Sequence, residues 1–200
     1  FYQRTKTVLE NIGNPFEIIL INDGSTDNSL DIMIELHKKD KRVKIIDLSR
    51  NFGKEIALTS GLDFSCGDVV IPIDSDLQDP PEVIPELYKK WLEGFDVVYA
   101  TRKKRKGESF TKKWTASIFY KIINVFTSFK IPENTGDFRL LDRKVVEALK
   151  TLKEYHRFMK GLFSWVGFKQ TGIYYERDPR YKGKTKWNYW KLFNFAVEGI

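Results

Sequence analysis

The sequence predicts an α/β fold in one domain over residues 1–200, with a mostly parallel central sheet flanked by helices. Short apolar runs at 16–22, 43–48 and 68–73 each stop at polar residues, and segments with helical periodicity separate them. A strand, a helix and a second strand in this order form a parallel pair. Of the 200 residues, 42% are hydrophobic, which is enough for one packed core.

The first half of the chain alternates between helices and strands, and the helices begin at polar or proline-containing caps. In chain order we expect a helix in the first dozen residues, a strand at 16–22, a helix from the cap at 25–28 to about 40, a strand at 43–48, a helix from 51–54 to about 65, a strand at 68–73, a helix at 82–92 and a strand at 96–100.

The second half of the chain begins with a basic loop at 102–109, which has no apolar periodicity. We then expect an amphipathic helix at 114–129, a helix from about 143, an aromatic stretch at 158–168 and a short strand at 170–175. The segment 177–200 joins six basic residues to two tryptophans, and cations with interfacial aromatics are typical of a membrane-surface helix, expected at 187–200. No internal repeat or linker divides the chain.

Charge is distributed unevenly between the two halves. Residues 1–100 hold 11 Lys and Arg against 18 Asp and Glu, whereas residues 101–200 hold 23 against 9. The first half is therefore suited to a cation and the second to anions, such as nucleic acid, an anionic membrane or a phosphorylated substrate. The single cysteine, Cys66, cannot form an internal disulfide, which favours a reducing compartment. The sequence contains no run of 18 apolar residues that could span a bilayer.

Carboxylates follow two of the expected strands. Asp74 and Asp76 come directly after the strand at 68–73, and Asp23 follows the strand at 16–22. Ligands of α/β sheets bind at the carboxyl ends of strands, so these acids are expected to share one pocket. Two acids at this spacing favour a hard cation, Mg2+ or Mn2+, which would also bind the phosphates of a nucleotide.

Five segments together resemble one family, the polyisoprenyl-phosphate glycosyltransferases of glycosyltransferase family 2. They are NDGSTDNS (22–29), LSRNFGKEIAL (48–58), DSDLQDPPE (74–82), TGDFRLLDR (135–143) and RYKGKTKW (180–187). The resemblance covers nearly the whole chain and is stronger to bactoprenol glucosyltransferases than to dolichol-phosphate mannose synthases. It implies a GT-A type nucleotide-sugar-binding fold and inverting transfer of a sugar, glucose by preference, from UDP-glucose to a polyisoprenyl (undecaprenyl) phosphate.

The resemblance also implies roles for individual residues. Asp74 and Asp76 would hold the metal and the donor diphosphate, Asp23 and Lys54 would contact the nucleotide, and Asp137 would be the catalytic base. The residues expected to bind phosphate or acceptor are Arg102, Arg139, Arg180 and Lys186. The acceptor phosphate has a second pKa of roughly 6 and is largely ionised at neutral pH, so Asp137 is expected to orient or stabilise as much as to abstract a proton.

Family members differ from this chain at both ends. They begin with an earlier strand that helps to hold the nucleotide, and the closer bacterial group continues into membrane-spanning helices beyond the position of residue 200. We therefore expect a first strand before residue 1, spans after residue 200, a location at the cytoplasmic face of the cell membrane, and a possible homo-oligomer formed through the spans.

Alternative interpretations of the sequence lead to different expectations. Transfer from GDP-mannose, as in dolichol-phosphate mannose synthases, needs only a different donor. A processive polysaccharide synthase would carry an Arg-Trp pair, which the sequence lacks. A non-catalytic basic module for anionic lipid or RNA would bind without a divalent metal and leaves the paired acids unexplained, so no nucleic-acid partner is expected. A degenerate transferase would bind donor without reacting.

Overall fold

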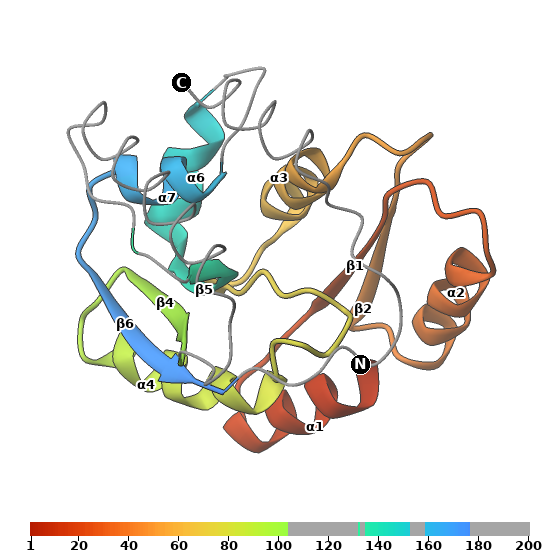
Figure 1. Ribbon diagram of the computed structural model, residues 1–200. Helices are drawn as coiled ribbons and strands as arrows, with labels where there is room; N and C mark the ends of the chain where they lie inside the picture. Colours follow the sequence, from red (N-terminus) through yellow and green to blue (C-terminus); the bar gives the residue numbers. More distant parts are fainter. Residues whose placement is uncertain (104–131, 133–134, 153–158, 177–200) are drawn as a thin grey trace, which may run out of the picture.

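Two sheets and the helices around them make up the part of the chain that the computed structural model describes, which is residues 1–103, 132, 135–152 and 159–176 (Figure 1). In Figure 1, helices α1 (Tyr2–Ile12) and α4 (Ile84–Leu92) lie below the larger sheet, and α3 (Lys54–Phe64), α6 (Arg143–Thr151) and α7 (Met159–Trp165) lie above it. The α/β class expected from the sequence is confirmed.

The smaller sheet pairs β1 (Ile18–Asn22) with β2 (Val43–Asp47) in parallel, with Ile18 opposite Val43. Helix α2 (Ser29–Lys39) connects the two strands, and its first residue, Ser29, donates a backbone hydrogen bond to Asp27 Oδ1 at 3.0 Å. This is the strand, helix and strand unit that the sequence predicts, with boundaries shifted by one or two residues.

The larger sheet has the order β3-β5-β4-β6 and mixes both strand directions, whereas the sequence predicts a single, mostly parallel sheet. β4 (Val97–Arg102) is parallel to β6 (Gln170–Tyr175), whereas β5 (Thr135–Asp142) is antiparallel to both β4 and β3 (Val69–Val70). The sequence shows no strand pattern around the TGDFR segment, because glycine and charged residues interrupt the apolar run. β3 is also shorter than the predicted strand at 68–73.

Alternating side chains of β5 contribute to two apolar clusters, one on each face of the larger sheet. On the α1 and α4 face, Phe138 and Leu140 pack with residues of β4, β6 and the short 3-10 helix η1 (Pro81–Val83) that leads into α4. On the opposite face, Leu141 packs with residues of α3, α6 and α7. Asp137 and Arg139 share the parity of Leu141, so the strand directs them toward α3 and α7.

The predicted helices in the first half are confirmed, as is the short strand that the structure places at β6. The basic loop after residue 103, the helix expected at 114–129 and the membrane-surface helix expected at 187–200 lie outside the described residues. Within the described part, no helix is long and apolar enough to cross a membrane.

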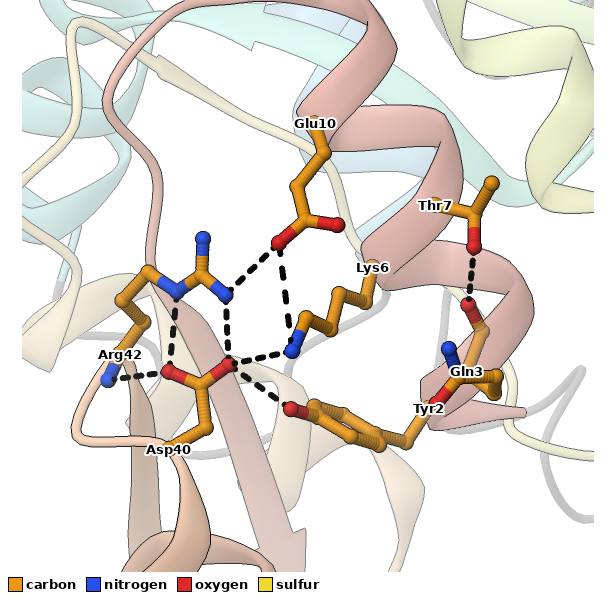
Figure 2. Close-up of polar contacts among 7 residues, drawn as sticks. All are labelled: Tyr2, Gln3, Lys6, Thr7, Glu10, Asp40 and Arg42. Atoms are coloured by element: carbon orange, nitrogen blue, oxygen red, sulfur yellow. Dashed lines mark hydrogen bonds and ion pairs between the residues drawn. The ribbon is translucent and has the colours of Figure 1, made fainter.

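Helix α1 is held to the smaller sheet by a network of polar contacts around Asp40, the C-cap residue that follows α2 (Figure 2). Asp40 accepts hydrogen bonds from Tyr2 at 2.8 Å and from Arg42 at 2.9 and 2.7 Å, and it lies 3.4 Å from Lys6 Nζ. Arg42 also bonds Glu10 of α1 at 2.9 Å. Helix α1 also contacts η1, through a bidentate pair between Arg4 and Glu82. Because η1 packs against the larger sheet, α1 joins the two sheets.

The Asp40 network predicts a pH-dependent contribution to stability. Hydrogen bonds from Arg42 and Tyr2 hold the pKa of Asp40 well below its ordinary value of 3.8. A depressed carboxyl pKa stabilises the folded state above that ordinary value, and the contribution is lost as the pH falls below it. We therefore expect Asp40→Asn to lower the melting temperature at neutral pH, and the difference from wild type to shrink on acidification. Circular dichroism melts, with exposed Asp63→Asn as control, check this; a difference that does not change with pH would contradict it.

Candidate active site

Acidic residues from separate segments meet at one end of the larger sheet. Asp74 and Asp76 follow the apolar residues that continue β3, and Asp137 lies near the start of β5. β3 and β5 run antiparallel, with Val70 opposite Leu141, so the chain leaving β3 approaches the beginning of β5. The strand arrangement therefore brings Asp74 and Asp137 to the same place.

Lys54, the first residue of α3, joins these two acids. Its Nζ lies 2.8 Å from Asp74 Oδ2 and 2.7 Å from Asp137 Oδ2. Burial lowers the pKa of Lys54, but Asp137 and Asp74 outweigh this and raise it above its ordinary value. Burial raises the pKa of Asp137, and the Lys54 ammonium more than reverses this and lowers it. Both groups are therefore charged at neutral pH.

The two carboxylate oxygens of Asp137 differ in their contacts: Oδ2 pairs with Lys54, and Oδ1 does not. Its side chain is 12% exposed, and Oδ1 is buried with no hydrogen-bond partner among the described residues. Buried carboxylate oxygens in folded proteins normally accept a hydrogen bond, and exceptions often belong to functional groups. Asp137 is therefore an ionised acid with an acceptor available for a ligand.

The Asp74-Ser75-Asp76 turn has a donor set that suits a hard divalent cation. Asp74 is 40% exposed, and Asp76 accepts a backbone hydrogen bond from Gln78 at 3.1 Å. Leu77, which follows Asp76, adopts a left-handed conformation with φ 61°, which is unusual for a residue other than glycine and is typical of constrained functional turns. No group of three or more metal-ligating side chains occurs within the described ranges, so two carboxylates would need phosphate or water oxygens to complete a shell.

Asp23 lies at the end of β1 and holds the loop that begins α3. Its carboxylate accepts backbone hydrogen bonds from Phe52 at 2.7 Å and Gly53 at 3.0 Å, and its backbone carbonyl accepts a hydrogen bond from the Asn51 side-chain Nδ2 at 3.0 Å. Gly24 adopts φ 64° here, and a Cβ on it would lie 2.4 Å from the Asn51 nitrogen. Asp23 therefore fixes the loop directly before Lys54 and affects the site through the position of that lysine. Its expected contact with a nucleotide stays a prediction.

Glu55 is a half-buried acid beside the site, and the sequence gives no reason to select it. Its Oε2 accepts a hydrogen bond from the Met159 backbone at 3.3 Å, which ties α3 to α7. Burial and the neighbouring Asp137 raise the pKa of Glu55 to about 7. Lys160 of α7 also faces this group, and its own pKa is lowered by burial. Only the sequence position next to Lys54 could have drawn attention to Glu55.

Arg139 is enclosed rather than presented to solvent. It is 2% exposed, its guanidinium stacks 4.0 Å from the centre of the Phe163 ring, and it donates to the Gly136 carbonyl at 2.8 Å. Burial lowers its pKa to about 10. Direct pairing with an acceptor phosphate would require the side chain to leave this position, so that expectation stays a prediction.

The remaining basic residues named from the sequence are only partly described. Arg102 ends β4 at the same edge of the sheet as Asp137, and its side chain is 32% exposed. Arg180 and Lys186 lie outside the described residues. The structure thus brings together Lys54, Asp74 and Asp137 by direct contact, and Asp23 indirectly through the loop before α3.

Comparison with known proteins identifies relatives along the whole chain. Residues 2–150 match the model of the family described as glycosyl transferase family 2. An uncharacterised glycosyltransferase of Synechocystis sp. is 57% identical over 199 residues, which are 100% of this chain and 63% of that protein. The bactoprenol glucosyl transferase of Shigella phage SfX is 48% identical over 200 residues, covering 100% of this chain and 66% of its own. The chain thus spans roughly two thirds or less of the length of these curated relatives.

A solved structure shares the fold at low sequence identity. The mannosyltransferase PcManGT from Pyrobaculum calidifontis, solved with GDP-Man and Mn2+, superposes with a TM-score of 0.54 at 16% identity, covering 86% of this chain and 51% of that one. Together with the family match, this identifies the fold as the GT-A type expected from the sequence.

The raised pKa of Glu55 predicts an effect on stability opposite in sign to that of Asp40. Between its ordinary value of 4.5 and about 7, the folded protein binds more protons at Glu55 than the unfolded chain does. The free energy of unfolding should therefore fall as the pH rises across this window, and Glu55→Gln should flatten that slope. Urea unfolding of both proteins at several pH values checks this, with exposed Glu86→Gln of α4 as the matched control. Parallel curves for wild type and Glu55→Gln would refute it.

Proposed function

The chain belongs to glycosyl transferase family 2, and we propose that it transfers glucose from UDP-glucose to a polyisoprenyl (undecaprenyl) phosphate, with inversion at the anomeric carbon. The observation that carries the proposal is the grouping of Lys54, Asp74 and Asp137 at one end of the sheet, in a chain 48% identical throughout to bactoprenol glucosyl transferases. The choice of glucose over mannose is supported by the names of these relatives.

Asp74 and Asp76 would hold a divalent cation, Mg2+ or Mn2+, together with the diphosphate of the donor. When bound, such a cation neutralises charge on the leaving nucleoside diphosphate. Lys54 already pairs with both Asp74 and Asp137, and the third N–H of its ammonium group could bind a phosphate oxygen as well. Asp23 fixes the loop before Lys54 and would lie along the nucleotide.

Asp137 would act on the acceptor. A phosphate oxygen of the lipid attacks the anomeric carbon, the bond from that carbon to the donor diphosphate breaks, and the nucleoside diphosphate leaves. Because Lys54 lowers the pKa of Asp137, the acid is a weak base, and the acceptor phosphate is already largely ionised. Asp137 is therefore better suited to orient the acceptor and stabilise charge at the reacting carbon than to remove a proton.

Basic side chains would balance the two sets of phosphates. Arg102 and Arg139 are close in the fold to Asp137, and Arg180 and Lys186 would add charge from the segment after β6. A polyisoprenyl phosphate is a membrane lipid, so transfer would take place at a membrane surface, at the cytoplasmic face where nucleotide sugars are available. The basic and aromatic residues in the sequence of 187–200 would suit a helix that lies along that surface.

The donor site predicts metal-dependent nucleotide binding. We expect calorimetric titration of UDP in the presence of Mn2+ to give saturable heat that chelator abolishes, and Asp76→Ala to lose at least tenfold in affinity because a metal ligand is removed (about 1.4 kcal/mol per tenfold). Glu86→Ala is the control. Binding of GDP in place of UDP would favour the mannose-transferring alternative, and binding without metal would favour a basic module that is not a transferase.

If Asp137 acts on the acceptor, its substitution should lower turnover without weakening donor binding. Asp137→Asn keeps the shape of the side chain but removes the charge that faces the acceptor. We expect kcat to fall by about a hundredfold or more, while the Kd for UDP changes little. Steady-state transfer from radiolabelled UDP-glucose to undecaprenyl phosphate, with circular dichroism to verify folding, measures both. Unchanged turnover in a folded variant would remove Asp137 from the mechanism.

A further inference from the structure

Arg102 is held by two buried polar residues from distant parts of the chain. The Tyr175 hydroxyl, on β6, donates a short hydrogen bond to Asp79 Oδ1, and Arg102 Nε donates to the Tyr175 oxygen at 3.2 Å. Arg102 Nη2 also lies 3.8 Å from Asp79 Oδ1. Asp79 is 2% exposed and Tyr175 is 4% exposed. This set, which we name the Arg102 support, joins the turn after Asp76 to the ends of β4 and β6.

The surroundings of the Arg102 support leave the guanidinium little freedom. The Tyr175 ring packs edge to face on Phe138 of β5, with ring centres 5.9 Å apart and planes at 85°. On the other side, Arg102 Nη2 would lie only 2.8 Å from a Cβ at position 136, so the glycine before Asp137 leaves the space that the guanidinium occupies. The Arg102 guanidinium therefore lies against the backbone at Gly136, directly before Asp137.

Arg102 stays positively charged and partly exposed while the Arg102 support holds it. Its side chain is 32% exposed, whereas that of Asp79 is 3% exposed, so the arginine side chain is partly open to solvent while the acid that supports it is enclosed. An arginine has five N–H donors, and two groups of the support account for only part of them. Burial lowers the pKa of Arg102, but Tyr175, Asp79 and Asp74 together raise it. The result is a permanent cation, fixed in direction, whose hydrogen-bond donors are only partly used by the described residues.

We propose that Asp79 and Tyr175 are positioning residues, which orient the Arg102 guanidinium to bind a phosphate group during transfer, and that Gly136 leaves the space for it. The proposal rests on the proposed function for the identity of the substrates. The phosphate can belong to the polyprenyl acceptor or to the donor diphosphate, and both present the same oxygens to a planar guanidinium.

The first test compares two tyrosines on the same strand. Tyr175→Phe removes only the hydroxyl and keeps the ring on Phe138, whereas Tyr174→Phe, at a 69% exposed neighbour, is the matched control. In the full-length protein in detergent, we expect Tyr175→Phe to raise one KM by about tenfold, the size of a hydrogen bond to a charged group, with kcat nearly unchanged. A rise in the KM for undecaprenyl phosphate identifies the acceptor phosphate, and a rise in that for UDP-glucose identifies the donor. No change in either would overturn the proposal.

A double-mutant cycle separates positioning from general support of the fold. If Tyr175 acts through Arg102, Tyr175→Phe should have no further effect on that KM in an Arg102→Gln background. An equal effect in both backgrounds would show that Tyr175 serves the fold alone. Where Tyr175→Phe fails to fold, Asp79→Asn replaces it, with the same expected loss of additivity.

A chemical readout keeps this proposal separate from the proposed function. Phenylglyoxal modifies accessible arginines, and mass spectrometry of peptides gives the rate at Arg102 relative to Arg50. We expect Tyr175→Phe to raise this ratio severalfold and Tyr174→Phe to leave it unchanged. If the wild-type enzyme transfers no glucose but the ratio rises, the proposed function fails while the positioning of Arg102 stands; an unchanged ratio overturns the positioning whatever the activity.

Discussion

One ammonium group between two carboxylates is the interaction on which the site depends. Asp74 and Asp137 would repel each other at the end of the sheet, and Lys54 lies within 2.8 Å of both. The position of Lys54 is set by the start of α3, and Asp23 fixes that start through two backbone N–H groups. The order of dependence thus runs from the loop after β1, through a helix terminus, to the charges where a diphosphate would bind.

The antiparallel strand β5 explains why groups from both faces of the sheet converge there. Its alternation directs Asp137 and Arg139 toward α3 and α7, and Gly136 and Phe138 toward the Tyr175 side. Lys54 therefore approaches the strand from one face while Arg102 approaches from the other. A strand parallel to β3 in this place would have its amino end at the opposite end of the sheet, away from Asp74. The site therefore depends on the reversed direction of β5.

Local patterns predict most of the fold and the part of the site that depends on strand ends. The β1 and β2 pair, the helices α2, α3, α4 and α6, and the strand β6 follow from apolar runs and caps, and family motifs select Lys54, Asp74 and Asp137. Strand β5 could not be predicted, because Gly136, Asp137 and Arg139 break its apolar pattern and become buried only through tertiary packing. Glu55 and the Asp79 to Tyr175 bond were also missed, since the latter joins residues 96 positions apart.

The close approach of Arg102 to Gly136 has a consequence for how related sequences can diverge. A side chain at position 136 and a guanidinium at position 102 compete for one volume, because the two would lie 2.8 Å apart. A lineage that enlarges residue 136 must therefore shorten or redirect residue 102, and a lineage that shortens residue 102 relieves the constraint on 136. The two positions, one at the end of β4 and one at the start of β5, should therefore change together.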